Sequence, residues 1–306
     1  MNGSSAGSGP RHRPVLAEQV LHLLDPQPGQ VIVDATVGGG GHSRLMAARV
    51  LPGGRLLGLD QDASMLKLAA PGLEGLPVTL EHANFGHLRQ VLNEWGVERV
   101  DAVFADLGFC TDQLEDPTRG LSFQVTGPLD MRLDQTGDCT AGDLLQGLPE
   151  RELADLFWEY GEERFSRRIA RTIVNRRRER PVESTDDLAE LVRRSVPRSS
   201  GRGGIHPATR VFQALRIAVN RELEALDQLL ASLPSCLKPG GKAAIVSFHS
   251  LEDRRVKLAF REKSLWNVLT RKPVTAAEDE VETNPRARSA KLRGAVLKET
   301  ASPSRP

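Results

Sequence analysis

The stretch Val31-Ile32-Val33-Asp34-Ala35-Thr36-Val37-Gly38-Gly39-Gly40-Gly41-His42-Ser43 predicts a buried β-strand that opens into a glycine turn and then a helix. A β-branched run is typical of a central parallel strand, and glycine reaches φ values that other residues avoid, so the turn can approach a ligand closely. A second apolar run, at residues 56–59, ends at Asp60. An acid at the tip of the second strand is placed to accept two hydrogen bonds from a ribose diol.

The residues of this turn argue against two classes of ligand. A phosphate-binding loop ends in Gly-Lys-Ser/Thr, and no lysine precedes residue 67. The dinucleotide spacing Gly-x-Gly-x-x-Gly can start at Gly38 or Gly39, but its last position then falls on Ser43 or Arg44, which disfavours a pyrophosphate. A nucleoside cofactor without phosphates, such as S-adenosylmethionine, remains, with its amino-acid end against the glycines and its ribose on Asp60. The alternative is an ordinary α/β turn in which the glycines only tighten the bend.

Charge is unevenly distributed along the 306 residues, although the 41 basic and 40 acidic side chains nearly balance. Residues 1–113 hold 8 Lys/Arg and 12 Asp/Glu, whereas residues 161–221 hold 15 Arg, no lysine and 7 Asp/Glu. The second segment is a candidate surface for a polyanion. An alternative is that arginine is plentiful throughout, but this explains the preference for arginine over lysine and not the local excess of positive charge.

The three cysteines lie far apart, without a Cys-x-x-Cys pair, so we expect neither a disulfide framework nor a zinc site. Residues 1–11 are mostly small and polar and are expected to form a disordered tail. This tail has no apolar core, so it is neither a signal peptide nor a membrane span. We therefore expect a cytoplasmic protein that does not associate with membranes.

Strand and helix patterns alternate through the first third of the chain, which predicts a doubly wound α/β domain on a parallel sheet. From about residue 114 to 209 the chain is helical and charged, without a strand pattern, and includes a Gly/Ser/Arg loop at 198–204. Sheet character returns at 242–248, and an acidic segment at 276–280 is typical of a flexible loop. The simplest organisation is an α/β domain interrupted by a helical insertion after its fourth strand. The first expected elements are a helix at 15–24 and strands at 31–34, 55–60, 78–81 and 101–106.

Ligands of open α/β sheets bind beyond the carboxyl ends of the strands. Asp60, Phe85 and Asp106 follow the second, third and fourth expected strands. Phe85 is placed to flank an adenine, or is an ordinary core aromatic. Asp106 is placed to hold the amino group of the cofactor or to accept a hydrogen bond from a substrate amine, and the alternative is a turn or helix-capping aspartate.

Ordered blocks of residues, spread from about residue 12 to residue 293, carry a more specific signal than the glycine turn. They include Gly40-Gly41-His42-Ser43-Arg44, Asp106-Leu107-Gly108, Arg119-Gly120-Leu121-Ser122-Phe123, Gly127-Pro128-Leu129-Asp130-Met131-Arg132, Tyr160-Gly161-Glu162-Glu163-Arg164-Phe165, His206-Pro207-Ala208-Thr209-Arg210, Phe212-Gln213-Ala214-Leu215-Arg216-Ile217, Phe248-His249-Ser250-Leu251-Glu252-Asp253-Arg254 and Asn284-Pro285-Arg286-Ala287-Arg288-Ser289. With these blocks the chain resembles the small-subunit ribosomal RNA cytosine-N4 methyltransferase family. Its bacterial members use S-adenosylmethionine to methylate a decoding-region cytidine of 16S rRNA.

The resemblance implies a Rossmann-like class I methyltransferase, with a doubly wound, mostly parallel seven-stranded sheet and a helical insertion after the fourth strand. Residues 12–113 and 210–306 are then the discontinuous methyltransferase domain, and residues 114–209 the insertion that recognises RNA. The implied partner is 16S rRNA within the small ribosomal subunit. The sequence leaves open whether naked RNA is also a substrate and whether the protein is a homodimer.

The resemblance also assigns the cofactor site. In the family the first turn, the acid after the second strand, the ring after the third, the aspartate after the fourth and a nearby glutamine bind S-adenosylmethionine. The family usually has Val-Ser-Ser after Asp-Leu-Gly, where this chain has the bulkier Phe109-Cys110-Thr111, a departure that bears on the position of the glutamine. The implied cofactor residues are Gly40, Gly41, His42, Asp60, Phe85, Asp106 and Gln113.

The chemistry of cytosine points to the residues after the fourth strand. The exocyclic amine is a poor nucleophile because its lone pair is delocalised into the ring. An acceptor that pyramidalises this nitrogen stabilises the transition state, so Asp106 is the expected catalytic acceptor and Phe109 a ring on which the base stacks. A strong general base is not required, since proton loss to water can follow the transfer. The catalytic region has no metal-ligand pattern.

The target base must leave its stack to reach the methyl group, and the helical insertion suits this task. Arginines along one helix, followed by the run at 176–178, would face phosphates, although a solvated helix face is the alternative for any single arginine. Ser250 and Asp253 are expected to form a helix cap. The expected substrate contacts are Arg167, Arg168, Arg171, His206, Arg210, His249 and Arg254.

Three hypotheses stay open at this point. The favoured one is the RNA cytosine-N4 methyltransferase, the second a methyltransferase of DNA, another RNA or a small molecule, and the third a ribosome-assembly factor that binds RNA without chemistry. The arginine-rich insertion argues against a small-molecule substrate. The set of strand-end residues argues against a protein that only binds RNA, because such a protein has no physical need to keep them together.

Overall fold

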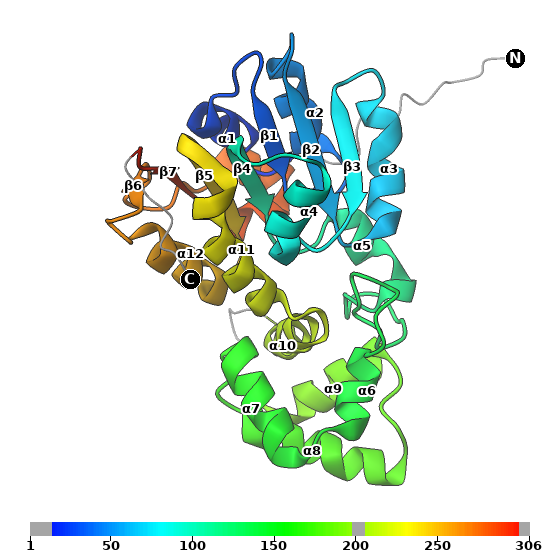
Figure 1. Ribbon diagram of the computed structural model, residues 1–306. Coiled ribbons are helices and arrows are strands. Elements are labelled where there is room, and N and C mark those ends of the chain that lie inside the picture. The colour runs from blue at the N-terminus through cyan, green and yellow to red at the C-terminus, as the bar shows by residue number, and fades with distance from the viewer. Residues whose placement is uncertain (1–13, 198–205, 300–306) are drawn as a thin grey trace, which may run out of the picture. The chain divides into compact units, whose positions relative to one another are not determined.

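The structure is a computed structural model that describes residues 14–197 and 206–299. The chain divides into two compact units, Met1–Gly108 with Ala225–Pro306, and Phe109–Glu224 (Figure 1). The sequence predicts boundaries between residues 113 and 114 and between residues 209 and 210, whereas the second unit begins at Phe109 and ends at Glu224. The expected tail at residues 1–11 and the Gly/Ser/Arg loop at 198–204 lie outside the described residues.

The first unit is built on one seven-stranded sheet with the order β3-β2-β1-β4-β5-β7-β6. The pairs β3–β2, β2–β1, β1–β4 and β4–β5 are parallel, whereas β7 is antiparallel to both β5 and β6. This arrangement confirms the predicted doubly wound, mostly parallel α/β fold. The strands are β1 (Val31–Asp34), β2 (Arg55–Asp60), β3 (Val78–His82), β4 (Val100–Asp106), β5 (Leu237–Ser247), β6 (Trp266–Val268) and β7 (Lys291–Leu297).

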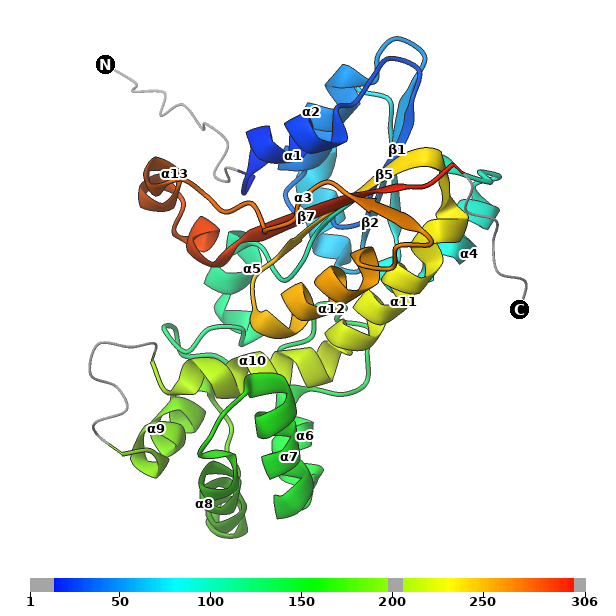
Figure 2. The same cartoon turned by 90° about the vertical axis from the view of Figure 1, so that its left-hand side faces the viewer.

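Helices cover both faces of this sheet (Figures 1 and 2). Successive residues of a strand point to opposite faces. Ile32 therefore packs in the core with α1 and α2, while its neighbour Val33 packs in the core with α4, α11 and α12. Burial on both faces explains why the central strands are continuously apolar. The helices are α1 (Ala17–Leu24), α2 (Gly41–Arg49), α3 (Ala63–Leu73), α4 (Leu88–Glu94), α11 (Glu222–Cys236) and α12 (Ser250–Phe260).

The acidic segment near the C-terminus is a helix, α13 (Glu278–Thr283), so the expected flexible loop is wrong there. Three acids occupy its first turn, where the positive end of the helix dipole favours negative charge. One of them, Glu280, accepts the backbone N–H of Leu16 at 2.7 Å and ties the helix to the start of α1. A 3-10 turn, η4 (Pro285–Ser289), then leads into β7.

The second unit is helical and has an apolar core of its own, which contains Phe157 and Ile173. Helix α10 belongs to this unit because Val211, Phe212 and Leu215 are buried in the same core. That packing explains why the unit continues past residue 209. The helices are α5 (Thr111–Glu115), α6 (Ala141–Gly147), α7 (Glu150–Gly161), α8 (Ser166–Glu179), α9 (Thr185–Ser195) and α10 (Ala208–Asn220).

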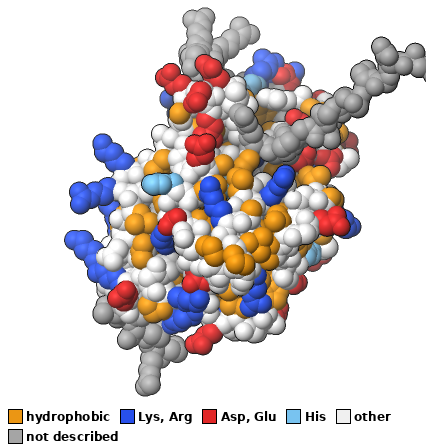
Figure 3. All heavy atoms as spheres, turned by 90° about the horizontal axis from the view of Figure 1, so that it is seen from above, with side chains coloured by type: hydrophobic (Ala, Val, Ile, Leu, Met, Phe, Trp, Pro, Cys, Tyr) orange, Lys and Arg blue, Asp and Glu red, His pale blue; other side chains and the backbone are white. Residues whose placement is uncertain are grey.

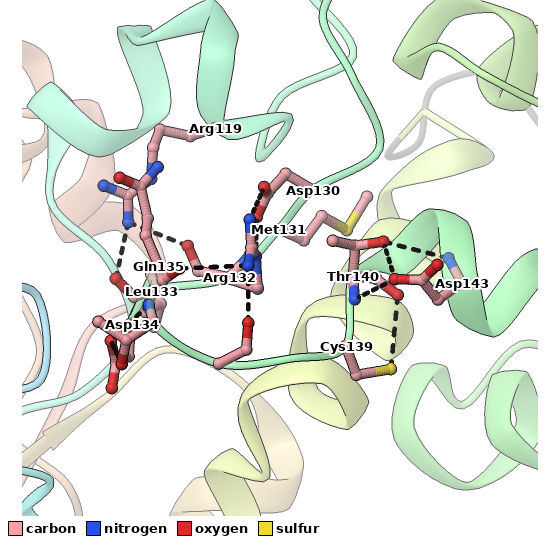
Figure 4. A network of polar contacts seen from close by, with 12 residues as sticks. Arg119, Asp130, Met131, Arg132, Leu133, Asp134, Gln135, Cys139, Thr140 and Asp143 are labelled. Atoms are coloured by element: carbon pink, nitrogen blue, oxygen red, sulfur yellow. Dashed lines mark hydrogen bonds and ion pairs between the residues drawn. The ribbon is translucent and has the colours of Figure 1, made fainter.

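Between α5 and α6 the expectation of helix is wrong, because residues 116–140 are mostly irregular and contain one 3-10 turn, η2 (Pro117–Arg119). Side chains take the place of regular backbone hydrogen bonding (Figure 4). The buried Arg119 donates from Nη2 to the carbonyls of Arg132 and Leu133 at 3.0 and 2.9 Å, and Arg132 makes two hydrogen bonds with Asp130 at 2.9 and 2.6 Å. Two of the blocks that carry the resemblance thus build this ordered segment.

Figure 3 shows a face of the molecule on which described basic and acidic side chains are interspersed with hydrophobic ones. Mixed signs of this kind agree with the near balance of charge over the whole chain. None of the described helices combines the length and the apolar character that a membrane span requires.

Candidate functional site

Three aspartates end neighbouring strands of the first unit. Asp34 ends β1, Asp60 ends β2 and Asp106 ends β4, and β1 pairs with both of the other strands. Burial raises the pKa of Asp34 to about 7, and the charges of Asp106 and Asp60 add to this effect. The structure therefore brings the predicted strand-end residues to one edge of the sheet.

The glycine turn between β1 and α2 uses backbone conformations that glycine adopts most readily. Gly38 has a φ of 51° and Gly40 a φ of 81°. A Cβ on Gly40 would lie 3.1 Å from the Cβ of Ala69, so the turn packs closely on α3. Gly41 begins α2, and the first N–H groups of a helix have no intrahelical acceptor. The turn thus offers a close backbone surface with hydrogen-bond donors beside the three aspartates.

Asp60 is held by two backbone donors. Its Oδ2 accepts the N–H of Gly38 at 2.8 Å, and its Oδ1 accepts the N–H of Asp62 at 2.9 Å. Burial raises the pKa of Asp60 to about 6, although these two hydrogen bonds act in the opposite direction. Each carboxylate oxygen can accept a second hydrogen bond, so the fixed Asp60 remains able to bind a ribose diol.

Asp106 has a buried acceptor without a donor. Its backbone N–H donates to Oγ1 of Thr36 at 2.6 Å, and the Thr36 N–H donates to Oδ1 of Asp34 at 3.1 Å. Among the described residues, no group donates to the buried Oδ1 of Asp106. Burial raises the pKa of Asp106 to about 7, while the charge of Arg286 lowers it and that of Glu252 raises it further. A buried acceptor of this kind fits an amine that arrives with a ligand.

These features fit S-adenosylmethionine better than a phosphate-bearing cofactor. Asp60 suits the ribose, the glycine turn suits the methionine end, and the unsatisfied Oδ1 of Asp106 suits a cationic amino group. The pKa values of the three carboxyl groups are already raised, and a pyrophosphate would oppose their ionisation further. A sulfonium and an ammonium group would instead favour their ionised forms.

The side chain of His42 has a structural role in this unit. Its Nε2 lies 2.9 Å from the carbonyl oxygen of Val15, and its ring lies against Phe104 with the centroids 4.6 Å apart. Burial lowers the pKa of His42 to about 4, so the neutral ring donates from Nε2. The side chain of His42 thus packs within its own unit, and its contact with the cofactor stays a prediction. The half-buried Phe85 begins a 3-10 turn, η1 (Phe85–His87), and packs against the core, so its role beside an adenine stays a prediction.

Gln113 and Phe109 belong to the second unit. The buried Gln113 accepts the backbone N–H of Cys110 through Oε1 at 2.9 Å and so stabilises the first turn of α5. Its predicted contact with the cofactor is not tested by this geometry. Phe109 lies under the guanidinium group of Arg216, whose Cζ is 4.7 Å from the ring centroid. The predicted ring is thus paired with an arginine that the sequence analysis did not single out.

The arginines of α8 differ in their surroundings. Arg167 and Arg168 are exposed, whereas Arg171 forms an exposed ion pair with Glu150 at 3.3 Å. In the following run, Arg177 donates to the carbonyl oxygens of two residues at the end of α6, and Arg176 lies 3.7 Å from Asp187. The run at 176–178 is therefore only partly available to phosphates, because two of its side chains bind other parts of the same unit.

His206 and Arg210, which flank the start of α10, are both exposed. The His206 ring stacks on Phe123 with the centroids 4.7 Å apart, and its Nδ1 accepts the N–H of Ala208 at 3.2 Å. Arg210 donates from Nη1 to the carbonyl oxygen of Glu162 at 2.9 Å. Both side chains are oriented by their own unit, and their contacts with RNA stay predictions.

The expected helix cap of Ser250 and Asp253 is wrong. His249 is the N-cap residue of α12, and Glu252 reaches back to the N–H groups of Phe248 and His249 at 2.8 and 3.3 Å. Asp253 instead pairs with Arg293 of β7 at 2.6 Å. The ring of His249 is largely buried, with Nε2 3.2 Å from Oε1 of Glu252, whereas Arg254 is exposed on α12.

Two charged residues that act on Asp106 were missed by the sequence analysis. Glu252 follows β5, and Arg286 lies in η4, where its guanidinium Cζ is 5.4 Å from the ring centroid of Phe248. Both fall within blocks that carry the resemblance, and this was the available signal. Their nearness to Asp106 depends on the sheet order, which the sequence does not show locally.

Comparison with known proteins gives a consistent result over nearly the whole chain. The model of the MraW methylase family matches residues 9–298. A protein named Ribosomal RNA small subunit methyltransferase H from Synechococcus sp. (strain JA-3-3Ab) is 50% identical over 296 residues, which cover 93% of this chain and 94% of that protein. Proteins of the same name from Pelobacter propionicus and Sorangium cellulosum are 46% and 49% identical, over 94% of this chain in both cases and 98% and 91% of those proteins.

Proposed function

The chain belongs to the MraW methylase family, and from this membership we propose that it transfers a methyl group from S-adenosylmethionine to N4 of a cytidine in the decoding region of 16S rRNA. The relatives named as small-subunit ribosomal RNA methyltransferases support the RNA as substrate. The resemblance drawn from the sequence supports the cytosine amine as the methylated group. Action on 16S rRNA, within the small ribosomal subunit, implies that the protein works in the cytoplasm.

One observation carries the proposal furthest, namely the unsatisfied Oδ1 of Asp106 at the edge of the sheet that also holds Asp60 and the glycine turn. A carboxylate oxygen without a donor is costly to bury, so a ligand donor at this position repays that cost. An amine is a suitable donor, and both the cofactor and cytosine carry one. The same edge thus supports cofactor binding and the orientation of the acceptor nitrogen.

Asp106 would act on N4 of the cytosine by geometry and charge. When bound, S-adenosylmethionine supplies a methyl group on a sulfonium, whose sulfur keeps the electron pair of the broken S–C bond. Asp106 would accept a hydrogen bond from N4–H, which favours a pyramidal nitrogen whose lone pair points toward the incoming carbon. Ring stacking by Phe109 would hold the base during this step. The extra N4 proton can leave to water, so the chain needs no strong base.

The second unit supplies the groups that we assign to RNA binding. Exposed Arg167, Arg168 and Arg171 on α8, and His206 and Arg210 at the start of α10, suit phosphates and an unstacked nucleotide. Arg254, exposed on α12 of the first unit, and the largely buried His249 are further candidates.

The experiment is methyl transfer from labelled S-adenosylmethionine to three acceptors, namely small ribosomal subunits that lack the modification, extracted 16S rRNA, and DNA. We expect label in the subunits with the parent chain and loss of label with Asp60→Ala and Asp106→Ala. Lys257→Gln on α12 is the control for a surface change. Label in DNA alone would contradict the proposal, as would tight cofactor binding without transfer to either form of rRNA.

A further inference from the structure

Arg216 of α10 lies over the ring of Phe109, with Cζ 4.7 Å from the ring centroid. Its guanidinium group is also fixed from the side by Glu222. The Nε of Arg216 donates to one carboxylate oxygen of Glu222 at 2.7 Å, and its Nη2 donates to the other at 2.9 Å. A bidentate pair of this kind holds the guanidinium plane in one orientation.

Burial distinguishes this pair from a surface ion pair. The side chains of Arg216 and Glu222 are only 12% and 9% exposed. The neighbouring pair of Arg221 and Glu224 has the same two hydrogen bonds, at 2.7 and 2.6 Å, but is 74% and 49% exposed. Removing two charges from water is costly, so a buried pair beside an aromatic ring calls for a role beyond surface charge.

A fixed guanidinium group restrains the ring that it covers. The cation attracts the face of an aromatic ring, and this attraction is stronger where water is excluded. Since Glu222 sets the plane of Arg216, and Arg216 covers Phe109, the orientation of the ring depends on both charged residues. The three residues come from the turn after β4, from α10 and from the start of α11, so the arrangement is produced by the fold and not by local sequence.

We propose that Arg216 and Glu222 are positioning residues that orient the Phe109 ring as the platform on which the target cytosine stacks before methyl transfer. This inference rests on the proposed function, because it assigns the ring to a nucleobase. Neither charged residue needs to touch the base. Their effect is on the probability that the ring is correctly oriented when the base arrives.

A double-mutant cycle tests the coupling, with small ribosomal subunits as acceptor and saturating S-adenosylmethionine. The variants are Arg216→Gln, Phe109→Leu and the combination of both, since leucine keeps apolar volume but removes the π-face. Arg216→Gln is expected to raise KM for subunits about tenfold, with kcat changed less than about twofold and cofactor affinity unchanged. In the Phe109→Leu background the same change is expected to alter KM less than about twofold.

Three further variants keep the test decisive. Arg216→Lys retains the charge but not the planar fork, and it is expected to raise KM even if Arg216→Gln does not fold, as judged by circular dichroism. Glu224→Gln is the matched control for Glu222→Gln, and only the latter is expected to raise KM. If Arg216→Gln or Arg216→Lys raises KM as much in the Phe109→Leu background as in the parent chain, this inference is overturned and the proposed function is not. Absence of methyl transfer by the parent chain would overturn the proposed function and this inference together.

Discussion

Replacing Asp106 by asparagine is expected to stabilise the cofactor-free protein while it weakens cofactor binding. The pKa of this carboxyl group rises from 3.8 to about 7 on folding, mainly because of burial. A shift of this size corresponds to about 4 kcal/mol of unfavourable ionisation in the folded protein above pH 7. The residue as a whole is only half-buried, so we expect the Asp106→Asn variant to recover about 2 kcal/mol at pH 8.

The raised pKa of Asp106 determines how the effect of Asp106→Asn on the free energy of unfolding varies with pH. Between about pH 4 and about pH 7 the folded protein holds a proton on Asp106 that the unfolded chain has lost, so the stability that the raised pKa provides is lost as pH rises through this window. The amide of the variant does not titrate. The difference in free energy of unfolding, variant minus parent, should therefore grow from near zero at pH 4 to its maximum at pH 8.

Urea denaturation of both proteins at a series of pH values measures this difference, and groups unaffected by the substitution cancel. Calorimetric titration with S-adenosylmethionine at pH 8 should show affinity about 10- to 100-fold weaker in the variant, the usual range for losing a charge-assisted hydrogen bond. A difference in unfolding free energy that does not change with pH would refute the assignment of a raised pKa to Asp106. Unchanged affinity would refute its assignment to the cofactor.

The other predictions concern the ribose contact, the irregular segment and the RNA surface. Asp60→Asn should weaken S-adenosylmethionine binding about tenfold in the same titration, because the amide offers one acceptor oxygen where the carboxylate offers two, and equal affinity would be inconsistent with the ribose assignment. Gly120→Ala should lower the free energy of unfolding in urea by about 3 kcal/mol or more, since Gly120 has a φ of 62° and a Cβ would lie 1.9 Å from a backbone carbonyl oxygen. Gly147→Ala, where a Cβ meets nothing within 4 Å, is its control and should cost little, so equal losses would contradict the steric reasoning. Changing Arg167 and Arg168 together to glutamine should make the slope of log affinity for 16S rRNA against log salt shallower by about 1.5, and an unchanged slope would remove both from the RNA surface.

Local patterns in the sequence sufficed for the centre of the sheet. The strands β1 and β2 begin and end where the apolar runs do, and β3 and β4 differ from expectation by one residue at one end. Burial on both faces makes such strands continuously apolar, which is a local signal. The short β6 and the strand β7 were not identified individually, and the three residues of β6 carry little pattern.

The irregular segment at 116–140 shows where local patterns fail. Its backbone is ordered by Arg119, Arg132 and Asn220, and Asn220 accepts the N–H of Leu133 at 2.7 Å from 87 positions away in the sequence. Polar residues that satisfy backbone groups at such distances have no periodicity to reveal them. The prediction of helix across this segment therefore fails.

The candidate site was predictable at the strand ends and not beyond them. Asp60 and Asp106 could be singled out because the carboxyl ends of parallel strands meet at one edge. Arg216 and Arg286 could not, since their positions beside Phe109 and Phe248 result from helix packing and sheet order. The contact of the buried His42 ring could not be predicted either, because its acceptor, the Val15 carbonyl oxygen, lies 27 positions away in the sequence.

The proposed function requires that the methyl group is transferred to the exocyclic amine of a cytosine, beside Asp106. The most direct measurement is the identity of the methylated nucleoside after the parent chain has acted on unmodified small ribosomal subunits, by digestion and mass spectrometry against standards of N4-, C5- and 2′-O-methylcytidine. We expect N4-methylcytidine as the product, and its loss with Asp106→Ala. Methylation at C5 or at the 2′-oxygen, or N4-methylcytidine undiminished by Asp106→Ala, would refute the proposed function or the role of Asp106 in it.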